Sequence, residues 1–193
     1  MKQAPFSVRR WTRAEYEELV ERGVFDGEPL ELLGGQLIVA EPQGPYHASA
    51  IGAVADALRA VLPAGWIVRE EKPVALDDES EPEPDIAVVP GSHRDYQIAH
   101  PPPPALTIEV AHSSLAFDRV AKASFYARAG IEDYWIVNLV DRVLEIYREP
   151  GPDPDASWGW RYRSAETLSP PARVTPLAIP AISVAVASLL PPR

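Results

Sequence analysis

The stretch Pro84-Asp85-Ile86-Ala87-Val88-Val89 decides the fold together with the later stretch Leu106-Thr107-Ile108-Glu109-Val110. Each is a short apolar run that carries one carboxylate, and such runs are typical of buried β-strands. A carboxylate in a buried strand costs free energy unless another charge compensates for it. If the two strands lie side by side, Asp85 and Glu109 converge on one face. Two hard oxygen ligands of this kind favour a site for Mg²⁺ or Mn²⁺.

A lysine follows these two strands on an expected helix. The helix is predicted to begin at Ser113 or Ser114 and to run to Ala129, with a glycine after it as the stop signal. If this helix packs back across the preceding strand, Lys122 is brought over Glu109. A cation at that place suits phosphodiester hydrolysis, because negative charge develops on the phosphate as the bond breaks.

Four further groups are candidates for the same site. Glu31 lies in an apolar context and is either a third metal ligand or a structural carboxylate. The main-chain carbonyl of Val110 is a candidate ligand. His47, at the start of an expected helix, either contacts phosphate or water or is an ordinary surface residue. Arg119 belongs to a small basic group and is a candidate for contact with the substrate.

Each main candidate also has a purely structural interpretation. Asp85 can simply end an acidic turn, with its side chain bonded to the backbone. Glu109 can be an exposed residue of an edge strand, and Lys122 can pair with Asp118 on a solvated helix face. Tyr126 is interpreted as a residue of the core or of a subunit interface. The occurrence of both carboxylates and the lysine in this order favours a site.

Composition bounds the class of protein. The chain has 193 residues, of which 46% are hydrophobic and 24% charged, as expected for one globular domain. It has no cysteine, which excludes disulfides and thiolate metal sites. Residues 1–6 lack the apolar core of a signal peptide, and the apolar stretch 177–190 is interrupted and too short to span a bilayer. We therefore expect a cytoplasmic protein with no membrane contact.

The net charge of −10 restricts the partners. Phosphate binding normally needs a basic surface, so strong non-specific affinity for DNA is not expected. Part of the excess is local, because six carboxylates lie within residues 77–85. We therefore expect DNA contact that is weak or confined to a local basic rim. We also expect a homodimer, because an acidic monomer would bind a DNA duplex weakly and the sites of two copies would suit its two strands.

The periodicity predicts an α/β (α+β) domain, with a single mixed β-sheet flanked by helices. The expected helices are a short one after Thr12, 47–62 and 113–129, and the expected strands are 30–40 (two strands around Gly34-Gly35), 66–76, 85–89, 105–111, 134–137, 143–147 and 158–163. Residues 90–104 are predicted to form a loop of the length often used as a lid. The whole chain, 1–193, is expected to be one domain. In this division 10–150 is the catalytic core, and 151–193 is a proline-rich extension that packs on the core or on a partner.

These residues together resemble the PD-(D/E)XK nuclease superfamily and, more narrowly, the Uma-type restriction endonuclease family. The stretches that carry the resemblance are 30–37, Glu41-Pro42 with His47, 84–86, 108–110 and 118–137. The resemblance implies a restriction-endonuclease-like core, with Asp85 and Glu109 as metal ligands and Glu31 as an accessory acid. The superfamily usually places its lysine two residues after the glutamate, where this chain has Ala111, so Lys122 is implied as the substitute.

The sequence supports two functional hypotheses. The first is an endonuclease that hydrolyses phosphodiester bonds of DNA with Mg²⁺ or Mn²⁺. The second is a catalytically inactive, homodimeric interaction protein built on a nuclease fold. A cysteine hydrolase is excluded by composition, and neither the Gly-x-Ser-x-Gly elbow of a serine hydrolase nor the Gly-x-Gly-x-x-Gly turn of a Rossmann enzyme is present.

Overall fold

The computed structural model describes residues 7–40, 43–156 and 158–192. The expectations made for residues 1–6 and for Glu41-Pro42 lie outside this part of the chain. The helices are α1 (Arg13–Glu21), α2 (Pro45–Arg59), the 3₁₀ turn His93–Tyr96, α3 (Leu115–Phe117), a π-helical turn (Asp118–Lys122), α4 (Ala123–Arg128) and the 3₁₀ turn Val186–Leu189. The strands are β1 (Leu30–Leu33), β2 (Gln36–Val39), β3 (Trp66–Glu70), β4 (Ile86–Pro90), β5 (Leu106–Ala111), β6 (Asp133–Asn138), β7 (Val143–Pro152), β8 (Trp160–Leu168), β9 (Arg173–Val174) and β10 (Val184–Ala185).

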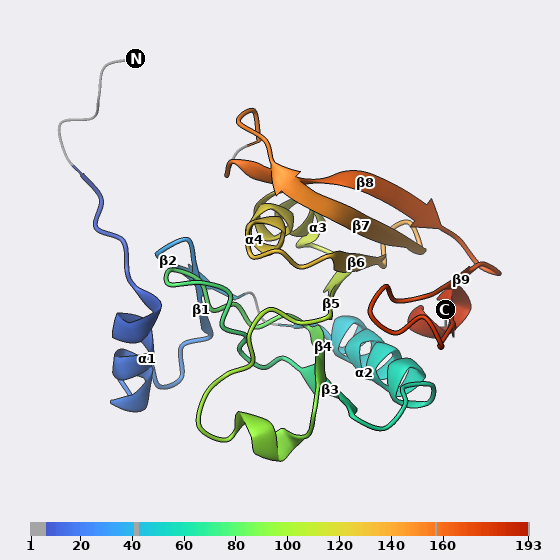
Figure 1. Ribbon diagram of the computed structural model, residues 1–193, viewed down its shortest axis with the longest axis horizontal. Coiled ribbons are helices and arrows are strands. Elements are labelled where there is room, and N and C mark those ends of the chain that lie inside the picture. The colour runs from blue at the N-terminus through green and yellow to red at the C-terminus, as the bar shows by residue number, and fades with distance from the viewer. Residues whose placement is uncertain (1–6, 41–42, 157, 193) are drawn as a thin grey trace.

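The main sheet has six strands in the order β3-β4-β5-β6-β7-β8 (Figure 1). Only the pair β5 and β6 is parallel, and the four other pairs are antiparallel. A parallel pair needs a crossover connection, which is supplied here by α3, the π-helical turn and α4. The prediction of a single mixed sheet flanked by helices is confirmed. The hairpin β1-β2 and the pair β9-β10 form two further small sheets.

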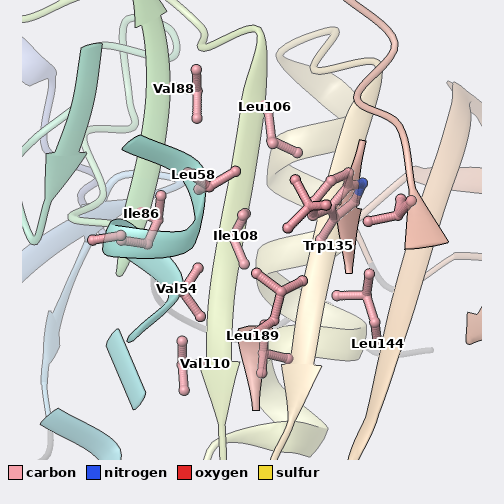
Figure 2. Close-up of a cluster of buried hydrophobic side chains, with 14 of the residues drawn as sticks. Val54, Leu58, Ile86, Val88, Leu106, Ile108, Val110, Trp135, Leu144 and Leu189 are labelled. Atoms are coloured by element: carbon pink, nitrogen blue, oxygen red, sulfur yellow. The ribbon is translucent and has the colours of Figure 1, made fainter. Parts of the chain in front are cut away.

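Strict alternation along the central strands divides the core between two faces. Ile86, Ile108 and Val110 belong to the larger cluster, in which α2 packs against the sheet (Figure 2). Ala87 and Ala111, one residue out of phase, belong to the second cluster, in which α4 packs. Successive side chains of a strand point to opposite faces. Glu109 therefore points to the face that α4 covers.

The second helix forms as its spacing predicts. It begins with Gly44 as N-cap and Pro45 in the first turn, where the missing amide hydrogen of proline costs nothing. Its buried residues recur at three- and four-residue intervals: Ala50, Ile51, Val54, Ala55 and Leu58. The first helix begins with a capping box, in which Thr12 and Glu15 bond to each other's backbone amides.

The C-terminal segment completes the larger cluster within the same chain. The chain after β9 runs beside α2 (Figure 1), and its buried side chains belong to the same cluster as those of α2 and the central strands. They are Ile179, Ile182, Val184, Val186, Leu189 and Leu190. Residues beyond 150 also supply β8, the edge strand of the main sheet. The proline-rich extension therefore supplies part of the core.

The Gly34-Gly35 turn joins β1 and β2 as predicted. The pairing of Leu33 with Gln36 leaves a two-residue loop, and both glycines have positive φ, +55° and +75°. Such a turn suits glycine because a side chain is strained in that conformation. A Cβ on Gly34 would also lie 2.7 Å from the ring of Phe125 in α4. The turn therefore docks the hairpin closely on the crossover helix.

Two predicted elements have different bounds in the structure. The strand predicted over 66–76 ends at Glu70, because Glu71 has φ +48° and Pro73 has no amide hydrogen for a ladder. The helix predicted over 113–129 is three consecutive pieces, with the π-helical turn in the middle. Phe117 and Val120, two apolar residues of this segment, are exposed.

Three further segments differ from their predicted bounds or content. The strands β7 and β8 end later in the chain than predicted, at Pro152 and Leu168. The loop over 90–104 contains the short 3₁₀ turn, which Ser92 and Asp95 cap.

Within the described residues, every helix is too short or too polar to cross a lipid bilayer.

Candidate active site

Asp85 and Glu109 lie opposite each other on neighbouring antiparallel strands. Ile86 pairs with Ile108, so the next position outward brings the two acidic residues together. The amide nitrogen of Asp85 lies 3.4 Å from Glu109 Oε2, and the amide of Val110 donates to Asp85 Oδ2 at 2.7 Å. The predicted convergence of the two carboxylates on one face is present.

Lys122 reaches the same place from the π-helical turn. Its Nζ lies 3.1 Å from Glu109 Oε1 and 3.7 Å from Glu31 Oε1, and the residue is only 8% exposed. Single π-turns within helices occur frequently at functional sites. The interpretation of Lys122 as a solvated surface residue is wrong, because the side chain is buried against carboxylates from two different sheets.

The charges around Lys122 are unbalanced. Burial alone would lower the pKa of its ammonium, but Glu109, Glu31, Asp118 and Asp85 outweigh burial and raise it. Lys122 is therefore held as a cation. Burial raises the pKa of Glu109 well above its usual value, against the opposing effect of Lys122, and the neighbouring carboxylates raise it further. One ammonium thus faces four carboxyl groups, more than its single charge can compensate, and a divalent cation would favour their ionised form.

Two further residues complete the surroundings of this pair. The buried hydroxyl of Tyr126 donates to Glu109 Oε1 at 2.5 Å. Asp118 is buried beside Lys122 and accepts a bond from Ser114 at 2.6 Å. Burial raises the pKa of Asp118 to about 6, although Lys122 and the Ser114 bond oppose this. The contact of Tyr126 was not predicted from the sequence, although the four-residue spacing from Asp118 to Lys122 to Tyr126 indicates it.

Glu31 and His47 both border the carboxylate pair. Glu31 is buried on β1, where its Oε2 accepts a bond from the amide of Glu83 at 3.3 Å. His47, in the first turn of α2, places Nε2 3.5 Å from Asp85 Oδ1. The hydrogen bond with Asp85 raises the pKa of His47, although burial opposes it. Both residues therefore lie close enough to belong to the same site, and their roles there stay predictions.

Two other candidates make contacts that were not predicted. Arg119 pairs with Glu145 on β7 through two bonds of 2.9 and 2.6 Å, away from the contacts of Lys122. Val110 contacts Asp85 through its amide, whereas the prediction concerned its carbonyl. The role of that carbonyl stays a prediction.

The donor set fits a small divalent cation with few protein ligands. Within the described residues, no three His, Asp or Glu side chains are placed so that they could hold a metal ion together. Mg²⁺, however, keeps several waters and is commonly held by one or two carboxylates together with substrate phosphate. Asp85 and Glu109 provide two such carboxylates on one face. Glu31 as a third direct ligand stays a prediction, because the structure places it against Lys122.

The six-stranded mixed sheet flanked by helices, which carries the paired carboxylates and the buried lysine, is an α+β fold. A solved structure shares this fold: a "putative nuclease" of DUF820 from Anabaena variabilis, with a TM-score of 0.61 and 17% sequence identity. The match covers 83% of this chain and 88% of that chain. No curated protein sequence matches the chain.

The family follows from the sequence match. The model of the Uma2 family, described as "Putative restriction endonuclease", matches residues 13–187. The chain therefore belongs to the Uma2 family. The match includes Glu31, the carboxylate pair and Lys122, and it also extends over most of the proline-rich extension.

Proposed function

We propose that this protein is an endonuclease that hydrolyses phosphodiester bonds of DNA with Mg²⁺ or Mn²⁺, as a member of the PD-(D/E)XK superfamily. The observation that carries the proposal is the convergence of Asp85, Glu109 and Lys122 at one buried point of the sheet. Family membership and the shared fold support nuclease chemistry. The excess of carboxylates around one ammonium supports the requirement for a metal.

Asp85 and Glu109 would hold the cation in this proposal. A divalent cation there polarises a phosphoryl oxygen and lowers the pKa of a bound water. Lys122 is kept positively charged by its neighbours, so it stabilises negative charge on the phosphate and does not act as a base. His47 would hold Oδ1 of Asp85, whose other oxygen accepts the bond from the amide of Val110.

The charge of the chain limits how DNA is held. With a net charge of −10, affinity must come from local contacts at the site, so we propose weak binding to DNA outside it. Arg119 is a candidate for such a contact because its side chain is partly exposed while it pairs with Glu145. A homodimer is part of the proposal, since two copies would present two sites to the two strands. Light scattering of the purified protein tests the dimer.

Plasmid cleavage tests the proposal directly. The purified chain with MgCl₂ or MnCl₂ should nick supercoiled plasmid, and EDTA should stop the reaction. Asp85→Ala and Lys122→Ala should each lower the rate at least about 100-fold, in the range that loss of one stabilising group costs. Asp56→Ala, an exposed carboxylate of α2, is the matched control and should cleave like the wild type.

Cleavage that survives both Asp85→Ala and Lys122→Ala would place the chemistry elsewhere. A pure wild-type protein that neither nicks plasmid nor binds Mn²⁺ would favour the inactive interaction protein. Circular dichroism of each variant separates lost chemistry from lost folding.

A further inference from the structure

The hydroxyl of Tyr126 makes a contact that the proposed chemistry does not yet use. It donates to Glu109 Oε1 at 2.5 Å, and the residue is fully buried. Its ring packs edge-on against Tyr134, with centroids 5.0 Å apart and an interplanar angle of 62°. The hydroxyl is therefore held in place by aromatic packing, as well as by the bond that it makes.

The two oxygens of Glu109 have different surroundings as a result. Oε1 is contacted by both Tyr126 and Lys122, at 2.5 and 3.1 Å. Oε2 faces Asp85 and, within the part of the chain that the structure describes, makes one long contact of 3.4 Å, to the amide of Asp85. Oε1 is thus occupied by donors, whereas Oε2 keeps capacity for another partner on the side of the second carboxylate.

We propose that Tyr126 is a positioning residue, whose hydroxyl holds Glu109 so that Oε2 is the oxygen presented to the divalent cation. The inference rests on the proposed metal site and deepens it, because it assigns one oxygen of one ligand to the cation. Tyr126 acts through Glu109 and touches neither metal nor DNA. Carboxylate ligands are themselves commonly oriented by hydrogen bonds, and loss of such a partner typically costs about 10- to 100-fold in metal affinity or activity.

The α4 helix explains why this position can act on Glu109. Lys122 and Tyr126 are four residues apart, so they lie on one side of the crossover and meet the same carboxylate. Glu109 lies on the face of β5 that this crossover covers. The crossover between β5 and β6 therefore supplies both the ammonium of Lys122 and the hydroxyl of Tyr126.

Tyr126→Phe tests the inference, because it removes only the hydroxyl and keeps the ring. Tyr162→Phe is the matched control: Tyr162 is also buried, belongs to the same aromatic cluster and donates to the carbonyl of Ile131 at 2.8 Å. Titration calorimetry with MnCl₂ should show roughly 10-fold weaker binding for Tyr126→Phe than for the wild type. The control should bind Mn²⁺ like the wild type.

Plasmid cleavage adds a second readout. Tyr126→Phe should cleave slowly at low Mn²⁺ and recover with excess Mn²⁺, whereas a purely structural defect would not recover. If Tyr126→Phe does not fold, Tyr126→Met fills the site without a hydroxyl and takes its place. If neither folds while Tyr162→Phe does, the hydroxyl serves the fold and the inference is overturned.

The remaining outcomes separate this inference from the proposed function. Equal Mn²⁺ affinity of Tyr126→Phe and the wild type overturns the inference, even if the wild type cleaves DNA. Weaker Mn²⁺ binding by Tyr126→Phe supports it, even if the wild type cleaves no DNA and the nuclease proposal fails. A wild-type protein that binds no Mn²⁺ overturns both.

Discussion

Glu31 and Glu109 share one ammonium although they belong to separate sheets. Lys122 Nζ lies 3.7 Å from the carboxylate of Glu31 on the β1-β2 hairpin and 3.1 Å from that of Glu109 on the main sheet. The contact ties the hairpin to the central strands through a buried ion pair. Removing the shared lysine would leave buried carboxylates without a partner, a loss that typically costs about 3–5 kcal/mol. The ion pairs of the site therefore also connect the β1-β2 hairpin to the main sheet.

Glu109→Gln should separate stability from activity. Burial makes the charged form of Glu109 costly, so a neutral amide of the same shape removes that cost. Lys122 keeps Glu31 as a close partner. We expect a melting temperature at least equal to that of the wild type, with DNA cleavage and Mn²⁺ binding lost. A variant that melts clearly earlier, or that still cleaves, would contradict this.

Stability should fall as pH rises from about 5 to 8, owing to Glu81. Burial and a hydrogen bond with Glu17 raise the pKa of Glu81 to about 8, against the opposing effect of Arg13. The folded state therefore binds a proton that the unfolded chain has lost in this window. By linkage, the free energy of unfolding then falls with pH, by at most about 1.4 kcal/mol per pH unit from this group.

Thermal melts between pH 5 and pH 8 measure the contribution of Glu81. Glu81→Gln cannot titrate, so its melting temperature should fall less steeply with pH than that of the wild type. Glu79→Gln is the control, because it replaces a nearby carboxylate of the same acidic segment. Parallel curves for the wild type and Glu81→Gln would show that Glu81 titrates as it does in the unfolded chain.

Arg119→Ala should reduce stability without affecting the metal. It removes two charge-assisted bonds to Glu145, which is only 5% exposed and retains donors from Asn138 and Tyr147. Bonds to charged groups contribute about 1.5–3 kcal/mol, so urea unfolding should show a loss of up to this size. Mn²⁺ affinity should be unchanged, since the side-chain bonds that Arg119 makes within the described residues go to Glu145. A weakened Mn²⁺ affinity would contradict this geometry.

Leu189→Ala should show that the C-terminal segment stabilises its own chain. Leu189 is fully buried in the larger cluster, and truncating such a side chain typically costs about 2–5 kcal/mol of unfolding free energy. The loss should be the same at low and high protein concentration, because the contact lies within one chain. Leu177→Ala, at an exposed position of the same segment, should cost little. A loss that depends on concentration would indicate a segment exchanged between two copies.

The sequence by itself determined the strands that carry Asp85 and Glu109, the helix α2 and the hairpin turn. Each depends on local regularities: apolar runs, three- and four-residue spacing, and a Gly-Gly turn. The cross-strand meeting of the two carboxylates also follows from sequence, because two neighbouring strands leave few registers that bury both apolar runs. The family resemblance pointed to the same residues.

Only the tertiary structure decided what surrounds that pair. The contact of Glu31 with Lys122 joins two sheets, and the bond from Tyr126 depends on how the crossover helix seats on β5. The π-helical turn beneath Lys122 and the pairing of Arg119 with Glu145 were likewise invisible in the chain. The physical reason is that periodicity reports which face of an element is buried. Which buried groups then meet depends on packing between elements far apart in sequence.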